Sequence, residues 1–121
     1  MASRKSQGSE STRRFRRQTV RVLVDYVSDR GVTCDYATTL GAGGLFLESE
    51  DLLDCGASIK MRFRLPRGEV LHEVEGRIVW ARAGARGDTM HAPGMGVQFT
   101  DRAASAKLAR DLEDWARLGD G

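Results

Sequence analysis

Hydrophobic and polar residues alternate through much of the chain, and this period of two predicts β-strands with one face on a core. In the first alternating run, one face holds Val20, Val22, Val24 and Tyr26, and the other holds Thr19, Arg21 and Asp25. A later run has the clearest period. It places Ile59, Met61, Phe63 and Leu65 inward and Lys60, Arg62 and Arg64 outward. The outward basic stripe is typical of a solvated face, and an acidic partner docked on it is the alternative.

The same alternation predicts four further strands. They are expected around Val32, Cys34 and Tyr36, over residues 45–48, over residues 70–82, and around Met95, Val97 and Phe99. One face of the long fifth strand is expected to hold Val70, His72, Val74, Gly76, Ile78 and Trp80. Gly76 in mid-strand indicates a bulge or a bend. Turns are predicted at residues 28–31 and 66–68, and Leu52 and Leu53 are expected to pack on the core from a loop.

The last part of the chain changes to a helical period. Its apolar stripe is Ala104, Leu108, Leu112 and Trp115. Thr100 or Asp101 is a suitable N-cap, and Gly119 is expected to end the helix. Six short strands joined by turns and followed by one helix predict a mainly β fold, a six-stranded antiparallel β-barrel with a C-terminal α-helix packed across it.

A glycine-rich stretch at residues 38–47, TTLGAGGLFL, separates the second and third predicted strands. Glycine adopts backbone conformations closed to other residues and lets other groups approach the backbone closely. The stretch therefore predicts a strand, a tight irregular turn and another strand. Arginines gather just before the first strand, in the sequence RRFRRQTVR of residues 13–21. We expect these two stretches to meet in space and to form one anion-binding site.

The charge distribution supports an anionic partner at the N-terminal end. The chain has 121 residues and a formal net charge of +2, which fits one domain. Residues 1–21 hold seven basic side chains against Glu10, whereas the rest holds 12 basic and 16 acidic side chains. A cationic arm on a mildly acidic body is typical of anion recognition. We expect residues 1–12 to be a disordered basic and serine-rich tail and residues 13–121 to form the barrel domain.

Several classes of function find no support in the sequence. It has no recognisable nucleophile, P-loop or dinucleotide motif and no suggestive carboxylate pair, so we expect no enzyme. His72 and His91 lack nearby ligands at metal spacing, so no metal site or cofactor is assigned. No apolar run approaches the ~20 residues of a spanning helix, and no secretory signal is visible. Cys34 and Cys55 are isolated and are read as reduced thiols of a cytoplasmic protein, with a disulfide as the minor alternative.

The combined pattern resembles a PilZ domain, a bacterial module that commonly recognises the second messenger cyclic di-GMP. The family signature is R-x-x-x-R before the first strand and [D/N]-x-S-x-x-G between the second and third. Arg17 and Arg21 fit the first element, and Arg13 with Arg17 gives an overlapping register that stays open. The sequences GGLFL at residues 43–47 and GMGVQF at residues 94–99 also resemble the family, and the similarity covers roughly residues 16–112.

The second motif departs from the family pattern. Aligned on Gly44, the acidic or amide position falls on Thr39 and the serine position falls on Gly41. The resemblance implies a ligand site. Its candidate residues are Arg13, Arg16, Arg17, Arg21, Thr39, Gly41 and Gly44. A threonine hydroxyl replaces a carboxylate poorly as an acceptor for guanine, so weakened binding of cyclic di-GMP is expected.

Three functions remain open from the sequence. The first is a non-catalytic bacterial signalling adaptor that responds to cyclic di-GMP and contacts one or more regulatory proteins. The second is a PilZ-like protein-interaction scaffold that no longer depends on the nucleotide, for example in motility or polarity control. The third is a nucleic-acid binder that uses the basic arm; it is disfavoured because Phe15 is the one aromatic residue interleaved with the basic ones. We therefore expect no nucleic-acid partner. We also expect no membrane insertion, because no apolar run is long enough to span a bilayer.

Overall fold

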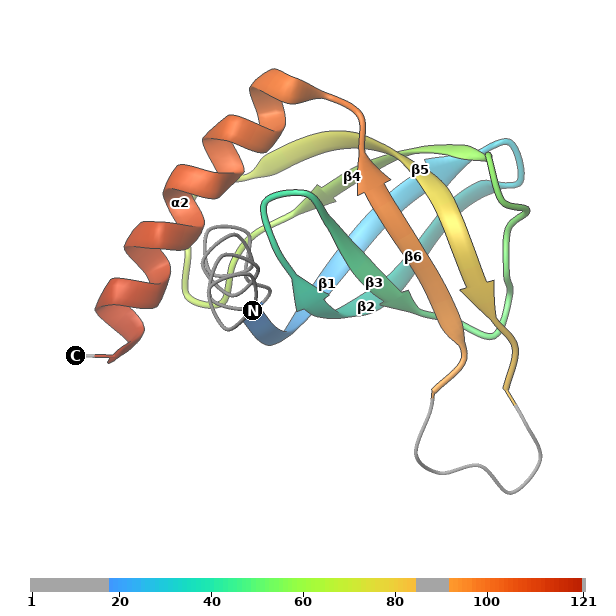
Figure 1. The fold of residues 1–121 in the computed structure, drawn as a ribbon, viewed down its shortest axis with the longest axis horizontal. Coiled ribbons are helices and arrows are strands. Elements are labelled where there is room, and N and C mark those ends of the chain that lie inside the picture. The colour runs from blue at the N-terminus through green and yellow to red at the C-terminus, as the bar shows by residue number, and fades with distance from the viewer. Residues whose placement is uncertain (1–17, 85–91, 121) are drawn as a thin grey trace, which may run out of the picture.

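The structure, a computed structural model, describes residues 18–84 and 92–120 (Figure 1). The described residues form six strands and one helix. These are β1 (Gln18–Ser28), β2 (Gly31–Leu40), β3 (Gly44–Glu48), β4 (Ser58–Phe63), β5 (His72–Arg82), β6 (Gly94–Phe99) and α2 (Arg102–Asp120). The strands close into a barrel in the order β1-β2-β3-β6-β5-β4, and every neighbouring pair is antiparallel. The predicted six-stranded antiparallel barrel with a C-terminal helix is confirmed.

The ladders between strands differ in length. β1 and β2 pair from Gln18–Leu40 to Ser28–Gly31, joined by a tight turn in which Gly31 has a φ of 111°. The seam that closes the barrel joins β1 to β4 through only three residue pairs, from Asp25–Arg62 to Val27–Lys60. The first half of β1 is therefore held in the barrel mainly by β2.

The barrel interior is filled by alternate side chains, as the strand pattern predicts. The predicted faces of β1 and β4 are confirmed, since their core positions are Val20, Val22, Val24, Tyr26, Ile59, Met61 and Phe63. Leu53 and Leu65 are also buried, and Leu52 packs on the core from its loop. One contiguous apolar core results, which is expected for a single small domain.

Two strands present faces that differ from the alternation pattern. Val32, Cys34 and Tyr36 of β2 lie on the outside, and Val32 is 77% exposed. On β5, the register shifts between Ile78 and Trp80, so Trp80 leaves the interior and is 40% exposed. The predicted common face for Trp80 and Ile78 is therefore wrong, because an extra residue in a strand reverses every later side chain.

Two further details of β5 also differ from the prediction. The strand begins at His72, so Val70 precedes it and is 39% exposed. The irregularity expected at Gly76 occurs two residues later, after Ile78. Gly76 instead leaves room in the interior, because a Cβ there would crowd the side chains of Val97 and Met61.

Helix α2 lies across one end of the barrel and contacts β5 (Figure 1). Asp101 caps it by accepting a hydrogen bond from the backbone N of Ala104 at 3.1 Å. Leu108 and Leu112 are buried on its inner face, and Trp115 donates its Nε1–H to the carbonyl oxygen of Pro66 at 3.0 Å. The predicted stripe is confirmed, but the helix continues through Gly119 rather than ending there.

Candidate functional site

The glycine turn between β2 and β3 is fixed by two backbone hydrogen bonds. The N–H of Gly41 donates to the carbonyl oxygen of Gly44 at 3.0 Å, which closes the turn. The carbonyl oxygen of Gly43 accepts from the N–H of Phe99 at 2.9 Å, which ties the turn to the end of β6. The predicted strand, turn and strand are confirmed here.

Glycine is required at one position of this turn for steric reasons. A Cβ on Gly44 would collide with the backbone carbonyl of Val97 on the neighbouring strand β6. A Cβ on Gly43 would meet nothing within 4 Å. Gly44 therefore permits close approach of two strands, whereas Gly43 faces open space.

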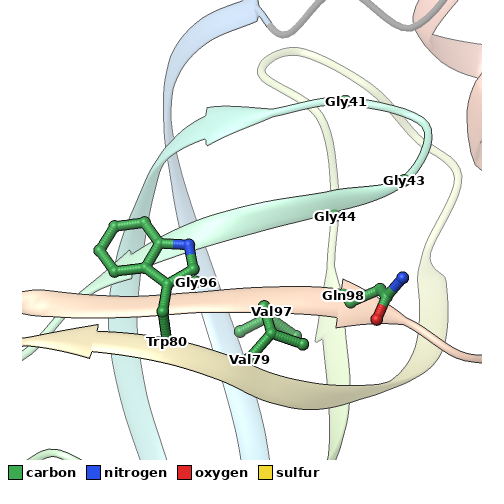
Figure 2. Close-up of a pocket in the computed structure, with 8 residues that line it drawn as sticks. All are labelled: Gly41, Gly43, Gly44, Val79, Trp80, Gly96, Val97 and Gln98. Carbon is green, nitrogen blue, oxygen red and sulfur yellow. The ribbon is translucent and has the colours of Figure 1, made fainter.

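A pocket of about 390 Å³ opens on the outer wall of the barrel beside this turn (Figure 2). Its lining residues are Gly41, Gly43, Gly44, Val79, Trp80, Gly96, Val97 and Gln98. Figure 2 shows the indole of Trp80 standing over Gly96 at one side and Gln98 extending outward at the other. The pocket thus combines glycine backbone, one flat aromatic side chain and one amide.

The position of Trp80 depends on Gly96. The two residues are paired across β5 and β6, and a Cβ on Gly96 would collide with the indole nitrogen. Because Gly96 lacks a side chain, Trp80 reaches across it and stacks on Phe46 of β3, with ring centroids 5.3 Å apart and an interplanar angle of 25°. The aromatic pair is therefore built on a glycine that lies between its two strands.

Arg82 adds a positive charge beside this aromatic pair. The central carbon of its guanidinium lies 5.2 Å from the Phe46 centroid and 5.6 Å from the Trp80 centroid. Its Nε–H donates to the carbonyl oxygen of Ala92 at 3.0 Å, which holds the side chain in place. Cation–π contacts of this kind add to the rigidity of an exposed aromatic side chain.

The predicted site residues other than Thr39 fall into three groups. Gly41 and Gly44 line the pocket. Arg21 lies on the outside of β1, with its guanidinium 4.1 Å from the ring centroid of Tyr36. Arg13, Arg16 and Arg17 lie outside the described residues. A role in ligand binding stays a prediction for all of these residues.

Thr39, which occupies the acidic or amide position of the second motif, lies on β2 between β1 and β3. Its partners are Thr19 on β1 and Phe46 on β3. Its Oγ1 is buried and has no hydrogen-bond partner among the described residues. A buried hydroxyl without a partner is uncommon and costs free energy.

The register of β1 places the entry of the chain beside the glycine turn. Gln18, the first residue of β1, pairs with Leu40, and Leu40 directly precedes Gly41. The arginine-rich stretch leads into β1 through Arg17, immediately before Gln18. Gln18 therefore lies beside the residue that precedes the glycine turn; that the arginines before it reach the turn stays a prediction.

Sequence reasoning misses the second wall of the pocket. The alternation assigns Trp80 to the interior, and no motif gives Gly96 or Gln98 a role in the site. A usable signal is the spacing of Gly94 and Gly96, which are outward positions of β6 because Met95 and Val97 are buried on its inner face. Two outward glycines on one strand indicate that large side chains from neighbouring strands cover it.

His72 is a structural residue, as its place on the core face predicts. It is 2% exposed, and its Nε2 lies 2.6 Å from Oδ2 of Asp111 on α2. Among residues 18–84 and 92–120, no group of three or more His, Cys, Asp or Glu side chains is arranged to hold a metal ion. His91 lies outside these residues. In the same part of the chain, no helix has both the length and the apolar character needed to cross a bilayer.

Three solved structures illustrate the fold that the chain shares with known proteins. The chain has 14% identity and a TM-score of 0.68 to the inhibitor of motility MotI/DgrA from Bacillus subtilis, covering 86% of this chain and 51%, about half, of that one. It has 12% identity and a TM-score of 0.63 to the PilZ domain of YcgR from Escherichia coli with c-di-GMP, covering 88% and 95%. It has 20% identity and a TM-score of 0.56 to the PilZ domain of CeSA from a cellulose-synthesising bacterium, covering 80% and 97%.

At these low identities, the TM-scores show a shared fold. No curated protein sequence matches the chain significantly. The family model described as the PilZ domain matches residues 11–115, which is most of the sequence. The chain therefore belongs to the PilZ domain family.

Proposed function

We propose that the protein is a non-catalytic adaptor of the bacterial cytoplasm that binds cyclic di-GMP weakly beside the glycine turn and signals to a protein partner. The observation that carries this proposal is the pairing of Gln18 with Leu40. It places Gln18, the residue after Arg17, opposite the last residue before the turn that lines the pocket, and this position supports the proposal that the preceding arginines reach the pocket. Membership of the PilZ family and the fold shared with the YcgR domain support the choice of ligand.

The chemistry of the pocket suits a guanine nucleotide. Guanidinium groups bind phosphate oxygens and the O6/N7 edge of guanine through paired hydrogen bonds. The exposed face of Trp80 offers a surface on which a base can stack. The glycine backbone at Gly41 and Gly43 allows close approach. Each of these groups acts by binding and orienting, so the proposal requires no catalytic step.

The altered second motif supports weak binding. Thr39 and Gly41 lack the carboxylate or amide and the serine hydroxyl of the family pattern. Each lost charge-assisted hydrogen bond costs about 1.5–3 kcal/mol, or about ten- to a hundredfold in affinity. We therefore expect a dissociation constant well above that of a PilZ domain with the intact motif.

Titration calorimetry of the full chain with cyclic di-GMP tests this function. We expect saturable heat for the wild type and a loss of at least about tenfold in affinity for Arg17→Ala or Arg21→Ala. Arg64→Ala is the matched control, since it removes an exposed arginine that follows β4, away from the pocket. Absence of heat from folded protein at high micromolar nucleotide, or equal losses in all three variants, would contradict the proposal.

A gain-of-function variant tests the role of the second motif. Thr39→Asp combined with Gly41→Ser restores both positions, and we expect at least about tenfold tighter binding. Thr38→Asp combined with Gly41→Ser is the control, because it adds the same groups with the carboxylate one residue away. Circular dichroism establishes that both variants fold. Equal affinities of the two double variants would show that the motif position has no special role.

A second candidate is a scaffold that acts through protein contacts without the nucleotide. The stacking of Arg21 on Tyr36 favours it, because this guanidinium already has an aromatic partner within β1 and β2. Under this alternative, partner recovery from cells is unchanged by depletion of cyclic di-GMP and by Arg17→Ala and Arg21→Ala. Recovery that falls under either change would instead support the nucleotide-dependent adaptor.

A further inference from the structure

The outer face of the β1–β2 hairpin exposes two cross-strand pairs of large apolar side chains, with the outward pair Asp25 and Cys34 between them. Leu23 pairs with Tyr36, and Val27 pairs with Val32. The exposed fractions are 52% for Leu23, 40% for Tyr36, 48% for Val27 and 77% for Val32. We call these four residues the hairpin face. Single exposed apolar residues are ordinary, but two exposed apolar pairs on one face of a hairpin are typical of an interaction site.

A column of basic residues borders the hairpin face on the β4 side. Val27 pairs with Lys60, and Asp25 pairs with Arg62. Arg64 follows at the next outward position and is exposed. We call Lys60, Arg62 and Arg64 the basic border. The apolar surface therefore has positive charge along one long edge.

The basic border keeps most of its charge available. Lys60 lies 3.9 Å from Glu75, and Arg62 lies 3.4 Å from Glu73, on the far side from the hairpin face. All four of these side chains are more than half exposed. Exposed pairs with such distances contribute about 0–1 kcal/mol, so these side chains can turn to another acidic group at little cost.

We infer that the hairpin face and the basic border together dock an amphipathic segment of a partner protein, apolar along one side and acidic along one edge. Apolar contact supplies affinity, and the charged edge fixes the orientation of the segment. This inference rests on the adaptor role only in requiring a protein partner. The inference specifies the surface to which the partner binds and the apolar and acidic side chains that the partner contributes.

Two other occupants fit the charges less well. Residues 1–17 of this chain carry six basic side chains against Glu10, the same sign as the basic border. A second copy would present the same surface, in which Asp25 is the acidic group among the outward positions of the described β1, β2 and β4 strands. A separate partner with acidic residues is the complementary choice.

Tyr36 of the hairpin face contacts Arg21, but the other end of that face lies away from the nucleotide pocket. Val32 lies next to Gly31 at the start of β2, whereas the pocket begins at Gly41, just beyond the opposite end of that strand. A variant at Val32 should therefore leave binding of cyclic di-GMP unchanged. Failure of the docking proposal and failure of the proposed function can be measured independently.

Site-specific photo-crosslinking in the cells that make the protein tests the inference. A photoreactive amino acid replaces Val32 in the full chain, and Glu75 on β5 is the matched control position, because it is also exposed but lies beyond the basic border. The crosslinked peptide is identified by mass spectrometry and synthesised. Its affinity for the purified chain is then measured by fluorescence anisotropy at two salt concentrations.

The expected result is an adduct from position 32, absent from position 75, with a peptide that has apolar residues at helical spacing and more acidic than basic residues. The peptide should bind at least about tenfold more weakly to Val32→Asp and to Arg62→Glu, and more weakly at high salt. Val32→Thr, which keeps the β-branched shape, provides a folded variant with a smaller loss. Calorimetry with cyclic di-GMP should give equal affinities for the wild type and Val32→Asp.

Each other outcome overturns the inference. Adducts only with a second copy of the chain would assign the hairpin face to self-association, and adducts with nucleic acid would assign it to a different class of partner. Equal adducts from positions 32 and 75, or no adduct from position 32, would remove the docking surface. A captured peptide that binds Arg62→Glu as well as the wild type would remove the role of the basic border.

Discussion

The Nε2 of His72 on β5 lies 2.6 Å from the Oδ2 of Asp111 on α2, and this contact joins the barrel to its terminal helix. The imidazole is 1% exposed and the carboxylate is 26% exposed. Removing the carboxylate leaves a buried ring nitrogen without a partner, so we expect Asp111→Ala to lower the free energy of unfolding by about 1–3 kcal/mol. Urea titration of the wild type and the variant measures this difference in the free energy of unfolding.

Asp114→Ala is the control for this prediction. Asp114 pairs with Arg117 on the same helix, and both side chains are well exposed. Its removal should change stability by less than about 1 kcal/mol. Equal effects of the two substitutions would show that the His72 contact does not hold the helix.

The two glycines at the end of the turn should respond differently to a methyl group. Gly44→Ala places a Cβ against the backbone carbonyl of Val97, and neither strand can move without weakening the β3–β6 ladder. Overpacking of this kind costs about 1–3 kcal/mol. Gly43→Ala meets no atom within 4 Å and should leave stability within about 0.5 kcal/mol. Chemical unfolding of both variants tests the difference, and a tolerated Gly44→Ala would contradict the close approach of β3 to β6.

Ionisation of Tyr26 should lower the free energy of unfolding at alkaline pH. Burial of this phenol raises its pKa, and its hydrogen bond to Asp35 at 2.6 Å raises the pKa further. The folded state therefore holds the proton more tightly than the unfolded chain. This contribution is fully present below the unfolded tyrosine pKa of about 10, and it is lost as the pH rises above that value.

Unfolding free energies measured from about pH 8.5 to about pH 11 test this prediction. A single proton linked in this way gives a slope of up to about 1.4 kcal/mol per pH unit above pH 10. Tyr26→Phe removes the ionisable group and should reduce the slope by that amount. An unchanged slope in Tyr26→Phe would show that other groups cause the alkaline loss.

The reactivity of Cys34 should depend on Asp25, its partner across β1 and β2. The neighbouring carboxylate of Asp25 raises the pKa of Cys34, because it stabilises the protonated thiol and repels the thiolate. Asp25→Asn should increase the thiolate fraction and accelerate alkylation by iodoacetamide near pH 8 several-fold, measured in a Cys55→Ser background. Asp29→Asn, at the exposed hairpin turn, is the control. Equal rates in the two variants would contradict the role of Asp25.

The strand faces of β1 and β4 could be predicted because their alternation is strict and one face is buried. In β2 the alternation does not identify the inner face, since Asp35 occupies a half-buried position there and accepts the hydrogen bond of Tyr26. A polar residue stabilised by a partner on another strand is invisible to a pattern of hydrophobicity. Val32 and Tyr36 are consequently outside, where they form part of the hairpin face.

The candidate site could be predicted in part for a similar reason. The glycine turn is visible in the sequence, and Gly41 and Gly44 do line the pocket. The alternation places Trp80 on the wrong side because its orientation depends on a register shift after Ile78, a feature of pairing between β5 and β6. Periodicity within one strand contains no information on a bulge that the neighbouring strand sets.

The short seam between β1 and β4 has a consequence for motion. With three residue pairs it is the least extensive ladder among the described strands. Its hydrogen bonds should therefore open locally before the domain unfolds globally. Amide protons across this seam would then exchange with solvent sooner than those shared by β4 and β5. Transient opening of the β1–β4 ladder would couple ligand binding at the N-terminal end of β1 to the position of the basic border on β4, without any change in fold.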